Sequence, residues 1–210
     1  MLVRDRMSRM PITTRPDATV PDALQVMRGS KVRQLPVVTE KGELVGIVSL
    51  VDLLRVSPSP ATSLSVWEME YLLEKITVEK VMTRDVITVT EDTAVEEAGR
   101  IMADNKVSGL PVMRDGELVG IITETHLFNI LVELFGAREP GIRVTARVKP
   151  EKGGLAKLSG AVSALGARFV AFGIAADSET ITFKVQEVEQ EALVKAIQPL
   201  VQEIVDVRES

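Results

Sequence analysis

Ser49 and Asp52 are polar residues at a spacing that could bind a ligand. Ser49 ends an apolar run, and Asp52 follows three residues later. If Ser49 begins a helix, its hydroxyl, the carboxylate and the free N–H groups of the first turn lie together. A carboxylate can accept hydrogen bonds from both hydroxyls of a ribose, and a phosphate is stabilised at a helix N-terminus. The same spacing is that of a plain capping box, so a purely structural role stays open.

An equivalent stretch later in the chain differs at the acidic position. Thr123 takes the place of Ser49, and His126 takes the place of Asp52. A neutral imidazole cannot accept from a diol as a carboxylate does, so we expect a second, degenerate site here. His126 is the only histidine and has no evident partner base, nucleophile or metal ligand, so we expect it to be structural. The sequence indicates no catalytic residue and no metal site.

The two stretches end long blocks that repeat each other about 75 residues apart, beginning at Met7 and Met82. Each block predicts a β-α-β-β-α unit preceded by a short lead-in helix, at 2–7 and 78–82. The expected first strands are 12–14 and 86–89, and the expected strand pairs are 35–39 with 43–48 and 110–114 with 117–122. One block is too short to bury a core comfortably, so the two should be halves of one domain.

The first helix of each block has expected start and stop signals. Thr19 with Asp22, and Thr93 with Glu96, have capping-box spacing. The helices should end near the residues of each block that best tolerate a left-handed cap, which are Gly29 and Asn105.

The segment between the blocks is too apolar for a free linker. After the proline-containing stretch 57–62, Ser65 and Glu68 offer another capping box and predict a helix. We interpret this helix as a cover for the domain's own core. A contact patch for a second subunit is the alternative, because the only tryptophan and the only tyrosine, Trp67 and Tyr71, lie here.

A second domain is expected after Phe135. Its expected elements are strands at 142–148, 168–175, 180–185 and 204–207 and helices at 155–165 and 192–201. The order strand-helix-strand-strand-helix-strand is the ferredoxin-like plan.

Composition narrows the class of protein. The chain has 210 residues, 45% of them hydrophobic and 26% charged, which is ordinary for a globular protein. A net charge of −5 argues against nucleic acid as a partner. Without cysteine there is no disulfide framework, and without a signal peptide or an apolar run of membrane-spanning length we expect a cytoplasmic protein with no membrane contact.

The repeated blocks resemble the cystathionine-β-synthase (CBS) domain, whose paired form, the Bateman module, is regulatory and binds adenosine-containing ligands. The resemblance covers about two thirds of the chain and rests on DATVPDALQVM, RQLPVV and GIVSLVD, and on DTAVEEAGRIM, SGLPVM and GIITETH. It implies that Ser49 and Asp52 hold ribose and phosphate and that Arg33 reaches the phosphate. The second block has Ser108 in place of Arg33. The backbone expected to line the adenine pocket lies near Thr14, Val32 and Ile47.

The C-terminal segment resembles the ACT domain, a ferredoxin-like module that often binds amino acids at a dimer interface, through KPEKGGLAKLSGAVSALGARF. The resemblance places the ligand turn at Gly153, Gly154 and Leu155. The acid that usually heads this turn has no clear equivalent, because Pro150 falls there. We therefore expect amino-acid binding to be weak or absent.

Two CBS repeats followed by an ACT domain are similar to the AcuB-type acetoin-utilisation proteins. The implied fold is α/β (α+β), a pseudo-symmetric tandem CBS pair plus a ferredoxin-like domain. The implied segments are CBS repeat 1 at 1–60, a linker helix at 61–77, CBS repeat 2 at 78–137 and an ACT-like domain at 140–210, with 1–137 as one module.

The function implied by this resemblance is that of a non-catalytic, homodimeric sensor. Its ligand would be AMP, ADP, ATP or S-adenosylmethionine, and it would act on an unidentified regulated protein without a cofactor. The alternative is a structural assembly module with vestigial ligand sites.

Overall fold

The computed structural model describes residues 1–56, 65–149 and 151–209. The chain divides into two compact units, Met1–Leu127 and Phe128–Ser210. Their boundary lies inside the helix α5 (Glu124–Leu134), earlier than the expected one between 137 and 140. The whole proline-containing stretch 57–62, and Pro150, lie outside the described residues.

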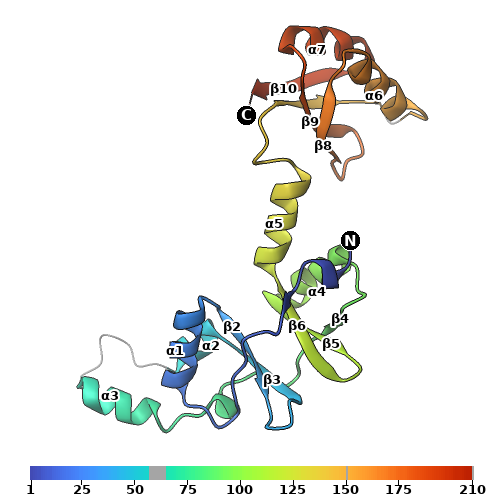
Figure 1. The fold of residues 1–210 in the computed structure, drawn as a ribbon. Coiled ribbons are helices and arrows are strands. Elements are labelled where there is room, and N and C mark those ends of the chain that lie inside the picture. The colour runs from blue at the N-terminus through green and yellow to red at the C-terminus, as the bar shows by residue number, and fades with distance from the viewer. Residues whose placement is uncertain (57–64, 150, 210) are drawn as a thin grey trace. The chain divides into compact units, whose positions relative to one another are not determined.

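The first unit contains both repeats in the expected order (Figure 1). The first repeat consists of the 3-10 helix η1 (Val3–Asp5), β1 (Ser8–Arg9), α1 (Val20–Ser30), β2 (Gln34–Val38), β3 (Leu44–Ser49) and α2 (Leu50–Arg55). After α3 (Val66–Leu73), the second repeat consists of η2 (Val78–Lys80), β4 (Val89–Thr90), α4 (Val95–Asn105), β5 (Gly109–Arg114), β6 (Glu117–Thr123) and α5. The mixed α and β architecture and the tandem repeat are therefore as predicted.

The repeats exchange their lead-in segments. β1 pairs antiparallel with β6 of the second repeat, in the sheet β1-β6-β5-β4. In return, the backbone of Thr83 exchanges two hydrogen bonds of 2.9 Å with Ile47 in β3. Val78 N donates to Ala18 O over 2.8 Å, at the start of α1. Each repeat thus completes the other, and the two form a single unit, as expected from their length.

The expected first strands are shorter than predicted. Thr14 forms only an isolated parallel bridge with Val37 of β2, and of 86–89 only Val89 belongs to a strand, β4. These first strands therefore add only one or two residue pairs to their sheets. The exchanged lead-in segments supply further pairing.

The predicted capping boxes form at the starts of α1, α2 and α3 but not of α4, and the left-handed residues that end α1 and α4 differ from those expected. Thr19 and Asp22 form the predicted capping box. The Thr93 capping box is wrong, because α4 is capped by Ala94 and the Thr93 hydroxyl instead accepts from Thr90 N. The left-handed residues that end α1 and α4 are lysines rather than Gly29 and Asn105, namely Lys31 and Lys106. α1 runs past Gly29 because the buried stripe continues to Met27, whose carbonyl accepts from Val32 N.

α3 does not cover the core in the way we expected. It begins with the predicted capping box, in which Ser65 Oγ donates to Glu68 Oε2 over 2.7 Å. Trp67 is 81% exposed and Tyr71 is 60% exposed, so this interpretation is wrong for both aromatic side chains. Leu73, at the end of α3, is the residue that packs against the core of the first repeat.

The second unit has the predicted ferredoxin-like topology. Its elements are β7 (Ile142–Arg147), α6 (Gly154–Ala164), β8 (Arg168–Ile174), β9 (Thr180–Gln186), α7 (Gln190–Ile197), η3 (Gln198–Leu200) and β10 (Glu203–Glu209). The sheet order is β10-β7-β9-β8, with every neighbouring pair antiparallel. α6 and α7 lie side by side on one face of this sheet (Figure 1). The core between the layers includes Val144, Leu158, Val162, Phe183, Leu193 and Ile197.

A buried lysine ties the segment before β7 to the second unit. Lys184 in β9 is 4% exposed. Its Nζ donates to Gly136 O over 3.0 Å and to Glu139 O over 2.7 Å. A buried ammonium requires such acceptors, because an unpaired charge away from water is costly. The residues between α5 and β7 are therefore held against β9 and belong to the second unit.

Candidate functional site

Ser49 and Asp52 form a complete capping box at the start of α2. Ser49 Oγ donates to Asp52 Oδ2 over 2.6 Å, and Ser49 N donates to the same oxygen over 2.9 Å. Asp52 N in turn donates to Ser49 Oγ over 3.2 Å. Both residues are half-buried, and none of the described residues donates to Asp52 Oδ1. The box satisfies the helix start and leaves one carboxylate oxygen available to a ligand.

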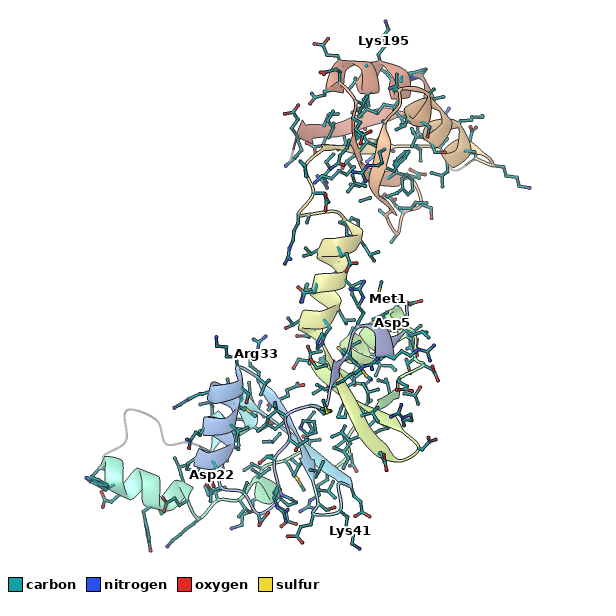
Figure 2. The ribbon with its side chains drawn as sticks, in the orientation of Figure 1. Met1, Asp5, Asp22, Arg33, Lys41 and Lys195 are labelled. Atoms are coloured by element: carbon teal, nitrogen blue, oxygen red, sulfur yellow. The ribbon has the colours of Figure 1, made fainter. Side chains whose placement is uncertain are left out.

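Strand pairing brings Arg33 to the same place. Gln34 is the register partner of Ser49, and Leu50 N donates to Arg33 O over 2.9 Å. Arg33 is exposed and follows the C-terminal end of α1, whereas Asp22 lies in its first turn (Figure 2). The backbone of Arg33 thus lies next to the start of α2, and a guanidinium and a carboxylate from neighbouring segments can together bind a ligand that carries both an anion and a hydroxyl pair.

The backbone that was expected to line the adenine pocket, at Thr14, Val32 and Ile47, has few free hydrogen-bonding groups. Thr14 N donates to Pro36 O, and Thr14 O accepts from Val38 N, each over 3.0 Å. Ile47 uses both of its backbone groups on Thr83. Val32 N donates to Met27 O over 3.0 Å, and no described residue donates to Val32 O. A base in this region would pack against side chains and could form a backbone hydrogen bond at Val32 O.

Gln34 is a polar residue of this region that the sequence reasoning missed. Its Nε2 donates to Ser108 Oγ over 2.6 Å, which links the two repeats. Its Oε1 is buried and has no hydrogen-bond partner. Gly109 contributes to this contact, because a Cβ at Gly109 would collide with Gln34 Oε1. The repeat contained a signal, since the second copy has glycine where the first has glutamine directly before Leu-Pro-Val.

The capping box of the second repeat, formed by Thr123 and His126 at the start of α5, has no acceptor left for a ligand. Thr123 N donates to His126 Nδ1 over 3.0 Å, so this nitrogen carries no proton. The neutral ring then has its proton on Nε2, which lies 3.2 Å from Ser8 Oγ and donates to it. Burial lowers the pKa of His126, which favours the neutral ring. His126 replaces the capping carboxylate with both ring nitrogens occupied, consistent with the expected structural role.

The glycine turn of the second unit lies at the start of α6. Gly153 is the N-cap residue with φ of 81°, a conformation that favours glycine. Gly154 and Leu155 form the first turn, and no side chain caps it. The Leu155 side chain is exposed.

In the described part of the chain, no helix combines the length and the apolar character needed to cross a membrane. Residues 1–56, 65–149 and 151–209 hold no cluster of three or more histidine, cysteine, aspartate or glutamate side chains suited to a metal ion.

Comparison with known proteins gives a consistent family match. The family described as "CBS domain" matches residues 3–59 and 78–133. The L-aspartate semialdehyde sulfurtransferase of Methanocaldococcus jannaschii is 31% identical over 139 residues, which cover 66% of this chain. The match spans only 24% of that enzyme's length.

Three solved structures share the fold of the first unit. The CBS domain pair of MJ0100, solved with 5′-methylthioadenosine and S-adenosyl-L-methionine, is 30% identical with a TM-score of 0.53 and covers 66% of this chain and 98% of its own. CBSX2 in complex with AMP is 31% identical with a TM-score of 0.52, covering 62% and 96%. A putative acetoin utilization protein (AcuB) from Vibrio cholerae is 31% identical with a TM-score of 0.54, covering 66% and 96%.

Proposed function

The chain belongs to the CBS-domain family, and from this we propose that it is a non-catalytic regulatory protein whose first repeat binds an adenosine nucleotide. Two related CBS pairs were solved with adenosine-containing ligands, AMP in one and S-adenosyl-L-methionine with 5′-methylthioadenosine in the other. These ligands support the proposed class, which includes AMP, ADP, ATP and S-adenosylmethionine.

The observation that carries the proposal is the free oxygen of Asp52. The cap uses Oδ2, and Oδ1 has no donor among the described residues. A ribose diol supplies two donors, and a carboxylate is the acceptor that binds them well. The exposed Arg33 supplies a positive charge for phosphate.

The second repeat lacks these features. Both ring nitrogens of His126 are engaged, and Ser108, which replaces Arg33, is bound to Gln34. We therefore propose that each chain binds no more than one such ligand with useful affinity.

Isothermal titration calorimetry of the full chain with AMP, ADP, ATP and S-adenosylmethionine tests this proposal. The expected result is one site per chain, and His126→Asp should partly restore a second. Two equal sites in the wild-type protein would contradict the asymmetry. Binding of none of these ligands would contradict the nucleotide proposal and favour the assembly module with vestigial sites.

Finer assignments extend this proposal. Relatedness to the AcuB protein supports a link with acetoin utilisation, and the ferredoxin-like topology with the Gly153 turn supports an ACT-like second domain. We propose a cytoplasmic location, in keeping with a cysteine-free chain.

We also propose a homodimer, because apolar side chains on α5 are exposed and the sheet of the second unit has edge strands, β8 and β10. Light scattering that gave only the monomer mass of 22.9 kDa at micromolar concentration would be incompatible with the dimer.

An assembly role is the second candidate function. It is favoured by the exposed Trp67 and Tyr71 on α3, since aromatic residues are enriched at protein interfaces. In that case the regulated partner, whose identity is open, would be held by contact rather than through a nucleotide-dependent change.

A further inference from the structure

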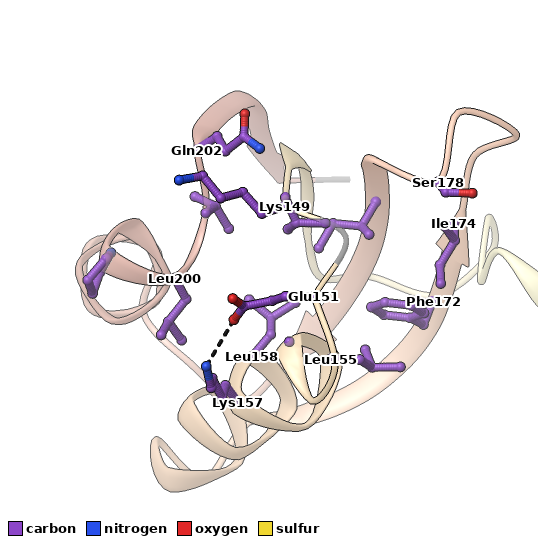
Figure 3. Close-up of a pocket in the computed structure, with 15 residues that line it drawn as sticks. Lys149, Glu151, Leu155, Lys157, Leu158, Phe172, Ile174, Ser178, Leu200 and Gln202 are labelled. Atoms are coloured by element: carbon purple, nitrogen blue, oxygen red, sulfur yellow. Dashed lines mark hydrogen bonds and ion pairs between the residues drawn. The ribbon is translucent and has the colours of Figure 1, made fainter.

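The second unit contains a cavity of about 630 Å³ that the nucleotide proposal does not use. It lies at the end of the sheet where β7 leaves and β10 begins, between the first turn of α6 and η3 (Figure 3). Small-molecule sites usually have volumes of roughly 300 to 1,000 Å³, so this cavity has room for a metabolite.

Apolar side chains from separate elements line much of the cavity. Leu158 and Ile181 are buried core residues at its base. Leu155 of α6, Ile174 of β8 and Leu200 of η3 are 51%, 58% and 37% exposed. Three large apolar residues exposed around one opening indicate a surface that is covered when a ligand is bound.

The charged groups of the cavity leave one positive charge unbalanced. Lys157 Nζ donates to Glu151 Oε1 over 2.9 Å (Figure 3), and this contact, helped by Lys149, lowers the pKa of Glu151 and keeps it ionised. None of the described residues accepts a hydrogen bond from Lys149 Nζ. Two lysines and one glutamate therefore give the lining a net charge of one positive. The first turn of α6, which has no side-chain cap, adds N–H groups that favour an anion.

We propose that this cavity binds a small apolar monocarboxylate, with its carboxylate at Lys149 and its hydrocarbon body against Leu155 and Ile174. A single negative charge balances the lining, and the apolar residues match a branched or aromatic chain. A free amino acid fits less well, because Glu151, the acid that would receive its ammonium group, is already paired with Lys157. This inference concerns the second unit and does not depend on the nucleotide proposal.

The test is isothermal titration calorimetry of the full chain with 4-methylpentanoate. The matched neutral probe is 4-methylpentanamide, and leucine is the amino acid with the same hydrocarbon chain. We expect one 4-methylpentanoate per chain. The amide should bind at least about tenfold more weakly because it lacks the charge, and hydrogen bonds to charged groups are worth about one to two orders of magnitude in affinity. Leucine should also bind at least about tenfold more weakly, because its ammonium group meets a lining that already has a net positive charge.

Two lysine variants localise the binding. Lys149→Met should weaken 4-methylpentanoate roughly tenfold to a hundredfold by removing the charge and keeping the apolar stem. Lys152→Met, on the same loop but outside the lining, is the matched control and should bind as wild type does. Circular dichroism verifies that both are folded. Absence of binding at millimolar concentration, equal affinity for acid and amide, equal affinity for leucine, or an unchanged Lys149→Met protein would each overturn the proposal.

Discussion

Replacement of Asp52 by alanine separates the two roles of this carboxylate. If Asp52 Oδ1 accepts from a ribose diol, the change removes hydrogen bonds to a charged group, worth roughly 1.5 to 3 kcal/mol. The affinity for the nucleotide should therefore fall by about one to two orders of magnitude. Calorimetric titration with whichever adenosine ligand binds wild type best measures this directly.

The same change also removes a helix cap, which must be controlled for. Loss of a capping acceptor costs roughly 0.5 to 2 kcal/mol, against a typical total stability of about 5 to 15 kcal/mol, so Asp52→Ala should stay folded. Asp22 offers the matched control. Thr19 Oγ1 donates to Asp22 Oδ2 over 2.7 Å, compared with 2.6 Å for Ser49 and Asp52.

Asp22 lies in the first turn of α1, about 12 Å along the helix axis from the last helical residue, Ser30, and Arg33 follows that end (Figure 2). Asp22→Ala should lower the free energy of unfolding, measured with urea, by an amount similar to Asp52→Ala. It should leave nucleotide affinity unchanged. Wild-type affinity in a folded Asp52→Ala protein, or equal losses in the two variants, would show that Asp52 acts only as a cap.

Two further changes test other parts of the structure. Burial lowers the pKa of His126 below the ordinary 6.5, so the unfolded chain binds this proton more readily than the folded one. The contribution of His126 is complete above about pH 6.5 and is lost as the pH falls below it. Urea midpoints should therefore drop less between pH 7.5 and 5.5 in His126→Asn than in wild type, and equal drops would refute this. Lys184→Met removes the hydrogen bonds to Gly136 O and Glu139 O, leaves Glu139 O with no donor among the described residues, and should lower the stability of the second unit by roughly 1 to 3 kcal/mol. The exposed Lys195→Met (Figure 2) should have little effect in calorimetry, and equal transitions for the two variants would contradict the role of Lys184.

The elements that the sequence predicted well are those whose apolar pattern records burial. β2, β3, β5 and β6 lie within a residue or so of their expected ranges, because each is apolar and bounded by a turn. Details that depend on a partner elsewhere in the chain were not predictable. The exchange of lead-in segments pairs Ser8 with Ile121 and Thr83 with Ile47, and periodicity indicates that a residue is buried without indicating what covers it.

In the candidate site, too, local features were predictable and contacts with the other repeat were not. The spacing of Ser49 and Asp52 was visible in the sequence and gave the capping box and its free oxygen. The expected role of the Ile47 backbone is limited by Thr83, a residue of the other repeat whose position no local pattern gives. Gln34 was missed for a related reason, since its burial depends on contact with Ser108 and Gly109.

Three capping boxes of the first unit, at the starts of α1, α2 and α5, indicate how a site can be lost while the fold is retained. At these three helix starts an acceptor three residues after the cap binds the backbone N–H of the cap residue, and Asp22, Asp52 and His126 supply it. A carboxylate meets that need with one oxygen and has a second for a ligand, whereas the second nitrogen of His126 is already used on Ser8. Either residue type can cap the helix, but at the equivalent positions 52 and 126 only the carboxylate keeps an acceptor for a diol. We therefore propose that histidine at position 126 preserves the pseudo-symmetric pair and leaves it with a single nucleotide site.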